Sequence, residues 1–258
     1  MKIVHSDRNY LYSILSTSFN MLKIKPAIIE LGVLNGENAK KMQQFLLPKK
    51  MVLLDAWSCD IFDDYRRNNA NRVWVDPIDN FHGYFGGALS EQKTFDQLYL
   101  VTQNLFATDT NVSIIRQGTK QGRDILRQSD PNLKFDLIYI DASHQFETVF
   151  DDLMLYENLV SDAGCIMLND CCHSNAGIRQ NIGVLEATVK FIKMTDFIPV
   201  AVTNTDWSDI ILLRKDSPLR EAIHNSILNS DKDYVEIPPQ LLGNLKVING
   251  SRPNLSFN

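Results

Sequence analysis

The stretch from residue 135 to residue 173 constrains the fold of this 258-residue chain more than any other. Residues 135–140 (FDLIYI) form an almost continuous apolar run, which is typical of a strand buried on both faces. Residues 146–159 have apolar side chains at helical spacing, residues 161–164 (SDAG) break that pattern, and residues 165–168 (CIML) are apolar again. Neighbouring parallel strands need a helical crossover, so this stretch predicts a βαβ unit within a parallel sheet.

Polar residues follow both predicted strands at the point where each strand ends. Asp141 and His144 come after the first strand, Asn169 and Asp170 come after the second, and His173 is close behind. The carboxyl ends of parallel strands share one rim of the sheet, where open α/β sheets bind their ligands. We therefore expect the first four of these side chains, with or without His173, to converge on one small volume.

The rest of the chain continues the alternation of strands and helices. Residues 204–207 are too few for a parallel crossover, so the strands on either side of them must be antiparallel. The sequence predicts a Rossmann-like, doubly wound α/β fold whose seven-stranded sheet is mostly parallel, with one antiparallel strand towards the C-terminus. The predicted strands are 27–31, 51–54, 112–116, 135–140, 165–168, 197–203 and 209–214, and the predicted helices are 6–23, 37–47, 91–107, 119–128, 146–159, 182–194 and 217–229.

Three segments are expected along the chain. Residues 1–25 form an N-terminal helical extension, residues 26–214 form the main domain, and residues 215–258 form a C-terminal helix and tail. Periodicity fails between residues 57 and 90, where aromatic, acidic and arginine side chains alternate without pattern. A loop of this length is usually functional or disordered, and its aromatic content argues against disorder. We therefore expect residues 57–90, called the lid below, to cover a ligand.

Composition excludes several classes of protein. The chain has 31 acidic and 26 basic residues, a formal net charge of −5 and a pI of about 5.5. A nucleic-acid or anionic-membrane binder would show a basic patch. The four cysteines have neither zinc-site nor disulfide spacing, and no apolar run is long enough to cross a bilayer. We expect a soluble, cytoplasmic protein with reduced thiols, bound to neither nucleic acid nor membrane.

The first strand-to-helix turn carries a glycine pattern, ELGVLNG, from Glu30 to Gly36. Glycine allows the backbone to approach a ligand closely, and the helix that follows offers free amides. The dinucleotide fingerprint of three glycines is absent, because Val33 and Leu34 follow Gly32. Asp55 closes the next strand, where an acid typically binds ribose hydroxyls. Together these features favour a nucleoside cofactor that lacks a pyrophosphate.

The order of elements, this glycine turn, Asp55 and the antiparallel strand resemble class I S-adenosylmethionine-dependent methyltransferases. More narrowly, IDASHQFETVFDDL followed by AGCIMLND is similar to the metal-dependent sugar O-methyltransferases of the macrocin and mycinamicin type, and to related cephalosporin-biosynthesis proteins. The resemblance covers roughly residues 26–214. Its most specific part is the D-x-x-H pattern together with the acidic tip of the next strand.

This resemblance implies a magnesium site and a catalytic base. Mg²⁺ would be held by Asp141, Asn169 and Asp170, and His144 would take the proton of the acceptor hydroxyl. The family usually has Glu-Asp where this chain has Asn169-Asp170, so the site has one negative charge fewer and should bind metal more weakly. A metal-free variant is the alternative. The expected cofactor contacts are Glu30, Gly32 and Gly36 at the methionine end, Asp55 at the ribose, Gln117 and Gly118 at the adenine, and Asp141.

The resulting hypothesis is an S-adenosylmethionine-dependent, magnesium-assisted O-methyltransferase. Its partner would be a small hydroxylated acceptor, a sugar or other natural product, and copies of the chain could associate through the N-terminal helix and the tail. Three alternatives stay open at this point. They are an NAD-dependent oxidoreductase, a cephalosporin-hydroxylase-like enzyme and a non-catalytic cofactor-binding subunit.

Overall fold

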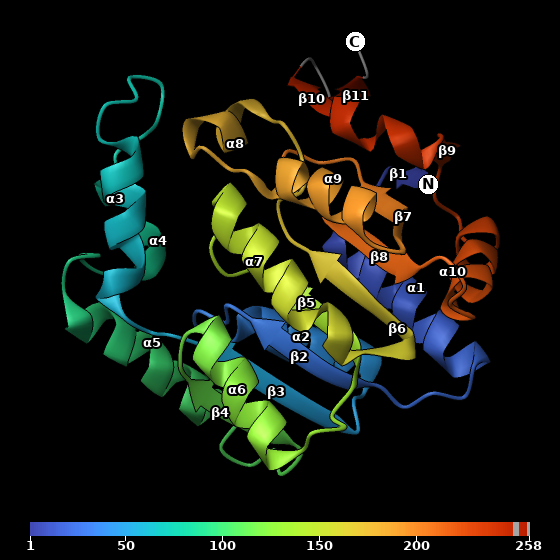
Figure 1. Ribbon diagram of the computed structural model, residues 1–258, viewed down its shortest axis with the longest axis horizontal. Helices are drawn as coiled ribbons and strands as arrows, with labels where there is room; N and C mark the ends of the chain where they lie inside the picture. Colours follow the sequence, from blue (N-terminus) through green and yellow to red (C-terminus); the bar gives the residue numbers. More distant parts are fainter. Residues whose placement is uncertain (250–252, 257–258) are drawn as a thin grey trace.

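The main sheet contains nine strands among residues 1–249 and 253–256, the part of the chain that the computed structural model describes. Their order is β4-β3-β2-β5-β6-β8-β7-β1-β9 (Figure 1). A separate hairpin pairs β10 with β11. The strands are β1 (Lys2–Val4), β2 (Ala27–Leu31), β3 (Lys50–Asp55), β4 (Val112–Arg116), β5 (Phe135–Ile140), β6 (Val160–Leu168), β7 (Phe197–Thr203), β8 (Ile210–Arg214), β9 (Tyr234–Glu236), β10 (Lys246–Asn249) and β11 (Pro253–Ser256).

The sheet is mostly parallel, as predicted. Strands β4, β3, β2, β5 and β6 pair in parallel, and β8 lies antiparallel between β6 and β7, which confirms the predicted antiparallel pair. The prediction of seven strands is wrong. Strand β1 adds to β7 in parallel and β9 adds to β1 in antiparallel orientation. Both added strands have three residues, too few for an alternating pattern to be recognised in the sequence.

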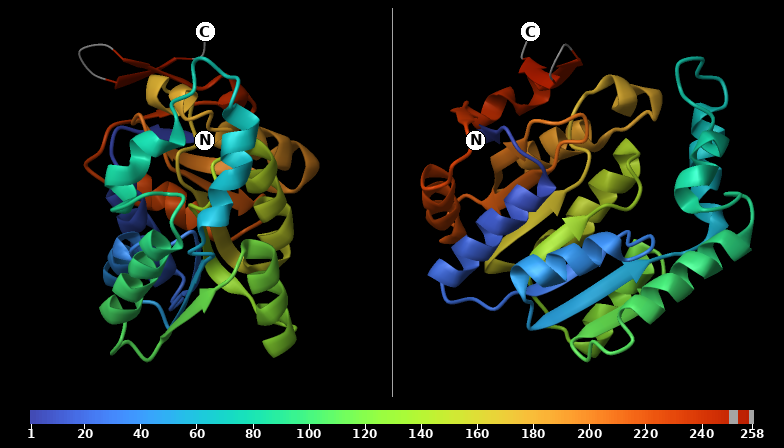
Figure 2. Two further views of the ribbon diagram at one scale, coloured as in Figure 1. Left: turned by 90° about the vertical axis from the view of Figure 1, so that its left-hand side faces the viewer. Right: turned by 180° about the vertical axis from the view of Figure 1, so that it is seen from behind.

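Helices cover both faces of the sheet (Figures 1 and 2). One apolar core packs under α6, α7 and α9, and the other packs under α1, α2, α5 and α10, so the doubly wound arrangement is confirmed. The helices outside the lid are α1 (Arg8–Met21), α2 (Glu37–Leu46), α5 (Gln92–Leu105), α6 (Thr119–Ser129), α7 (Phe146–Tyr156), α8 (Asn175–Arg179), α9 (Val184–Met194) and α10 (Leu219–Leu228), with 3₁₀ turns η3 (Glu157–Leu159) and η4 (Pro239–Asn244). No helix in the described ranges is long and apolar enough to cross a membrane.

The helix ends before residues 161–164, as predicted, but the predicted start of the next strand at residue 165 is wrong, because β6 begins at Val160 and includes these four residues. The pairing of β6 with β5 is irregular there: Phe135 pairs with Val160, whereas Leu137, two residues on, pairs with Cys165. The polar residues of the break therefore form an irregularity within a strand rather than a loop before it.

The lid is helical rather than an open loop. It consists of η1 (Cys59–Phe62), α3 (Asp63–Asn69), η2 (Ile78–Phe81) and α4 (His82–Phe85), and it rises beside α8 in Figure 1. Each of these helices has four to seven residues, which is too short for a helical period to stand out in the sequence. Its rings pack on α5, where Phe62 and Phe85 contact Phe95.

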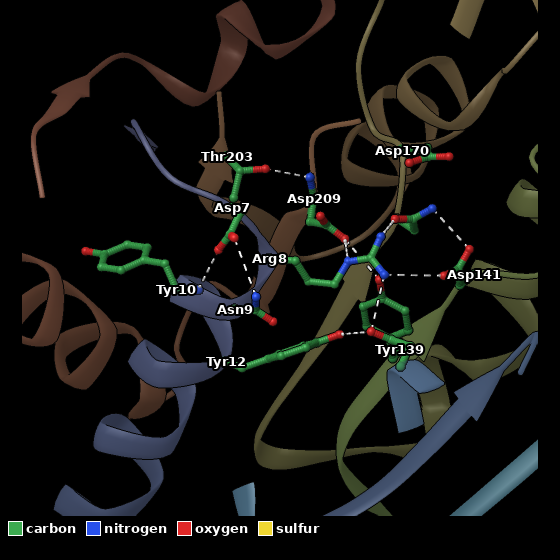
Figure 3. A network of polar contacts seen from close by, with 12 residues as sticks. Asp7, Arg8, Asn9, Tyr10, Tyr12, Tyr139, Asp141, Asp170, Thr203 and Asp209 are labelled. Atoms are coloured by element: carbon green, nitrogen blue, oxygen red, sulfur yellow. Dashed lines mark hydrogen bonds and ion pairs between the residues drawn. The ribbon is translucent and has the colours of Figure 1, made fainter. Parts of the chain in front are cut away.

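The N-terminal segment is integrated with the sheet. Strand β1 lies between β7 and β9, and α1 packs across the sheet face beside α2 and α10. Tyr12, Leu15 and Phe19 of α1 are fully buried. Because of this packing, the first residue of α1, Arg8, lies at the rim formed by the carboxyl ends of β5 and β6 (Figure 3).

Candidate active site at the carboxyl ends of the strands

The four polar residues predicted to converge do lie together. Asp141 follows β5, and Asn169 and Asp170 follow its parallel neighbour β6. The Nε2 atom of His144 is 3.4 Å from Oδ1 of Asp141 and 3.5 Å from Oδ2 of Asp170. The side-chain amide of Asn169 donates to Oδ1 of Asp141 at 3.1 Å. We call these four residues, with Arg8 and Asp209 described below, the rim cluster.

His173 does not join this cluster. Its Nε2 atom is 3.0 Å from Oε1 of Glu186 on α9. His173 is therefore left out of the rim cluster. The chain turns away after Asp170, whose backbone is in the left-handed region (φ 57°), a conformation that aspartate tolerates better than most side chains.

Arg8 occupies the centre of the cluster and was missed in the sequence (Figure 3). Its Nε is 3.0 Å from Oδ1 of Asp209, Nη1 is 3.8 Å from Oδ2 of Asp141, and Nη2 donates a hydrogen bond to Oδ1 of Asn169. The guanidinium also lies 5.6 Å from the centre of the Tyr139 ring. The link could not be read from the sequence, because more than 130 residues separate Arg8 from each carboxylate.

Asp209 directly precedes the antiparallel strand β8, which places it at the same rim. Its side chain is 2% exposed and accepts a hydrogen bond from the Tyr139 hydroxyl at 3.0 Å. Burial raises the pKa of Asp209 to about 7, although the charge of Arg8 opposes that rise. Burial likewise raises the pKa of Asp170 to about 6, against the opposing charge of His144. The rim cluster therefore holds acids that are costly to keep ionised.

For the pKa of His144, the neighbouring groups outweigh the effect of burial. Burial alone would lower its pKa, but the hydrogen bond to Asp141 and the negative charge of Asp170 outweigh burial, so its pKa is raised above 6.5. An imidazole held between two carboxylates in this way is suited to accept a proton, because the imidazolium that forms is stabilised by both neighbours.

The rim residues do not fit the predicted magnesium site. The carboxamide oxygen of Asn169 accepts from Arg8, and its amide nitrogen faces Asp141 and His144, so it offers no free oxygen. A guanidinium already lies among the acids. No group of three or more histidine, cysteine or acidic side chains in the described residues has the arrangement of a metal site. The prediction of Mg²⁺ on Asp141, Asn169 and Asp170 is not supported.

Glu30, the last acid of β2, is completely buried beside the rim cluster. Its Oε1 accepts from the Asn38 amide at 2.7 Å, and the oxygen of that amide accepts from Arg8 at 3.2 Å. Its Oε2 atom is buried and has no hydrogen-bond partner. Burial raises the pKa of Glu30 well above its ordinary value, because the ionised form is costly without a donor at Oε2, and a positively charged donor from a ligand would stabilise that form.

Asp55 fastens the glycine turn to the end of β3. Its Oδ2 accepts from the backbone amides of Val33 (2.8 Å) and Leu34 (3.0 Å), and its Oδ1 accepts from the amide of Trp57 (2.8 Å). The indole of Trp57 donates to the carbonyl of Leu34 at 2.7 Å. Both carboxylate oxygens are therefore engaged by backbone amides, and the role of Asp55 as a ribose ligand stays a prediction.

The two glycines of the turn have different surroundings. Gly32 (φ 82°) lies against the backbone after β5, where an added Cβ would be 2.5 Å from the Cα of Ala142 and would overlap the carbonyl oxygen of Asp141. Gly36 (φ 83°) precedes α2, and an added Cβ there would meet Phe106 and Leu105, the last residue of α5. Gly32 thus brings the ends of β2 and β5 into contact, as a turn of this kind requires.

Gln117 and Gly118 lie where β4 turns into α6. The backbone amide of Gln117 donates to the carbonyl of Asp55 at 2.9 Å, the side chain of Gln117 is exposed, and Gly118 precedes the first turn of α6. Gln117 and Gly118 therefore lie beside Asp55, and their contact with the adenine of a cofactor stays a prediction.

The lid is fastened to the segment around α8. Arg179 pairs with Asp76 at 2.7 Å, and the amide of Asn181 donates to Asn69 at 2.9 Å. Although 72% of Tyr84 is exposed, desolvation within the lid and the negative charges of Asp141 and Asp170 raise its pKa.

Two cavities in the described part of the protein lie away from the rim cluster. One, of about 570 Å³, lies between α1 and α10 and is lined by polar side chains such as Asn9, Ser13 and Asn229. The other, of about 450 Å³, lies against α2 and is lined by Lys40, Gln43 and neighbouring residues.

Comparisons with known proteins give structural likenesses alone. No family model and no curated protein matches the sequence. A candidate O-methyltransferase from Klebsiella pneumoniae is 15% identical, with 81% of this chain and 82% of that chain covered and a TM-score of 0.49. An O-methyltransferase from Bacillus cereus in complex with SAH is 11% identical (81% and 83% covered, TM-score 0.45). Spermidine synthase from Thermotoga maritima is also 11% identical (85% and 65% covered, TM-score 0.45). These TM-scores are below 0.5, so the fold assignment rests on the strand order described above.

Proposed function

We propose that this protein transfers a methyl group from S-adenosylmethionine to a hydroxyl of a small acceptor. The observation that carries the proposal is the buried, unpartnered Oε2 of Glu30 at the end of β2, beside the rim cluster. The amino group of the methionine end would supply the missing donors and a compensating positive charge. The strand order, with β8 reversed between β6 and β7, supports the same family resemblance.

The residues present give the site separate tasks. Glu30 would bind the amine of the cofactor, and Gly32 would let the methionine end pass close to the turn. Asp55, Gln117 and Gly118 would meet the nucleoside, the first by exchanging a backbone amide for a ribose hydroxyl. Bound S-adenosylmethionine supplies an activated methyl group on a positively charged sulfur.

His144 is the candidate general base. The bound cofactor would supply the methyl group to the acceptor hydroxyl and leave as the neutral thioether, and Nε2 of His144 would take the hydroxyl proton. Asp141 and Asp170 then stabilise the imidazolium from 3.4 and 3.5 Å. The lid would exclude water and align the acceptor, which is the larger part of the acceleration in such a transfer.

The experiment is a screen of purified protein with methyl-labelled S-adenosylmethionine against sugars, aminosugars and phenols, with unlabelled NAD tested separately for binding. Label should pass to at least one hydroxylated acceptor, and His144→Ala should strongly slow that transfer while binding of the cofactor persists. Binding of NAD without binding of S-adenosylmethionine would instead indicate the oxidoreductase alternative.

A further inference from the structure

Arg8 makes polar contacts with three different parts of the rim cluster. Through Nε it contacts Asp209, and through Nη1 it contacts Asp141. Through Nη2 it donates to the carboxamide oxygen of Asn169. A planar guanidinium can make these contacts at once, because its donors point outward in a fixed fork.

The charges around Arg8 explain why a cation is needed there. Asp141, Asp170 and Asp209 lie in the cluster, with Asp209 buried and the side chains of Asp141 and Asp170 22% and 13% exposed. His144 carries a charge only when it is protonated. Without Arg8, three acids would face one another with no permanent countercharge, an arrangement that proteins relieve by protonation or by binding a cation.

The orientation of Asn169 depends on the same contact. Its oxygen is directed to Arg8, so its amide nitrogen is directed to Asp141 at 3.1 Å and to Nε2 of His144 at 3.3 Å. A carboxamide that bound a metal ion would need its oxygen for the ion. Arg8 and a metal ion therefore compete for one oxygen of Asn169 and for the charge of Asp141.

We propose that Arg8 is the resident cation of this site: the guanidinium supplied by the first turn of α1 takes the position of a divalent ion among Asp141, Asn169 and Asp209 and orients Asn169 towards Asp141 and His144. Arg8 is thus a positioning residue. It is itself held in place, because β1 anchors the preceding residues between β7 and β9, and Asp7 caps α1 by accepting from the amide of Tyr10.

Where methyl transfer is concerned, this inference rests on the proposed function. The transfer then needs no divalent ion, and His144 removes the acceptor proton without a metal-bound oxygen. The presence or absence of a metal site is a separate property, which can be measured without cofactor or acceptor.

The test is a titration of the EDTA-treated full-length protein with Mn²⁺, in which the electron paramagnetic resonance signal of free Mn²⁺ is monitored. Wild-type protein should leave the signal unchanged. Arg8→Ala should bind about one ion per chain, at least about tenfold more tightly than wild type, through the released oxygens. The double variant Arg8→Ala, Asp141→Asn should lose that binding, and Arg8→Lys, which restores a positive charge, should exclude the ion again.

Arg214→Ala is the matched control. Arg214 has a side-chain exposure of 29% against 28% for Arg8, pairs with Asp196 at 2.6 Å and lies over the ring of Phe197, far from the rim cluster. It should behave as wild type in the titration. The proposal would be overturned if wild-type protein bound Mn²⁺ and Asp141→Asn removed that binding. This result does not depend on whether the Arg8 variants fold. A folded Arg8→Ala that binds no Mn²⁺ would overturn it too, whereas failure to bind S-adenosylmethionine would overturn only the proposed function.

Discussion

Removal of Arg8 should destabilise the protein mainly through the acid that it leaves behind. Asp209 is 2% exposed and has Arg8 as its ion-pair partner at 3.0 Å. Removing one member of a buried ion pair typically costs about 3–5 kcal/mol, because the other charge remains buried. We therefore expect Arg8→Ala to lower the free energy of unfolding by about that amount at pH 8.

A double variant, Arg8→Ala with Asp209→Asn, separates the cost of the uncompensated Asp209 charge from the loss of packing. Burial raises the pKa of Asp209 to about 7, against about 3.8 for an exposed aspartate. Since the folded pKa is the higher one, the cost of ionised Asp209 in the wild-type protein is absent below about pH 4 and complete above about pH 7, where it is about 4 kcal/mol. This cost is larger without the opposing charge of Arg8. Asp209→Asn removes that charge and keeps an oxygen for the Tyr139 hydroxyl. The double variant Arg8→Ala, Asp209→Asn should therefore be more stable than Arg8→Ala by about 2 kcal/mol at pH 8.

Urea unfolding followed by circular dichroism at pH 5 and pH 8 measures all four members of this cycle. The difference between Arg8→Ala and wild type should be smaller at pH 5, where Asp209 can take up a proton. A double variant no more stable than Arg8→Ala at pH 8 would refute the reasoning, because the loss would then come from packing and not from an uncompensated charge.

Three further outcomes are expected. Burial raises the pKa of Asp152, on α7, to about 7. Asp152→Asn should therefore stabilise the protein above pH 7 by up to about 4 kcal/mol and have no effect near pH 4; equal effects in urea unfolding at both pH values would contradict this. Gly32→Ala should lose folded protein in expression and unfolding assays, because a Cβ there overlaps the backbone carbonyl of Asp141; a normal melting curve would show that the turn can move apart. His144→Ala should lower the methyl-transfer rate by about 10²–10⁴, and the wild-type rate should rise with pH through a pKa above 6.5, because the unprotonated imidazole is the base; a pH-independent rate would count against that role.

The central βαβ unit could be predicted because its evidence is local. Residues 135–140 are buried throughout in β5, and Asp141, His144, Asn169 and Asp170 meet at its rim, as strand ends in a parallel sheet must. The antiparallel β7–β8 pair followed from a connection too short for anything else. In both places a few neighbouring residues determine the geometry.

The missed features depend on contacts between distant residues or on very short elements. Strand β1 has three residues, and nothing near it in sequence indicates that it pairs with β7. Arg8 is the residue that argues against the metal prediction, and its partners in the rim cluster, Asp141, Asn169 and Asp209, lie at the ends of strands much later in the chain. A family pattern in residues 141–170 suggested a magnesium site. The residue types at a strand end do not reveal whether the cation among them is a metal ion or a side chain, so the pattern alone could not exclude Arg8.

The central claim is that the end of β2 binds S-adenosylmethionine through the free oxygen of Glu30. Isothermal titration of wild-type protein and of Glu30→Gln with S-adenosylmethionine tests it most directly, with Asp152→Asn as a control for loss of a buried carboxylate elsewhere. Wild type and the control should bind the cofactor equally, and Glu30→Gln should bind it about tenfold or more weakly, because a charge-assisted hydrogen bond is lost. Equal affinities of wild type and Glu30→Gln, or no binding by wild type, would contradict the claim.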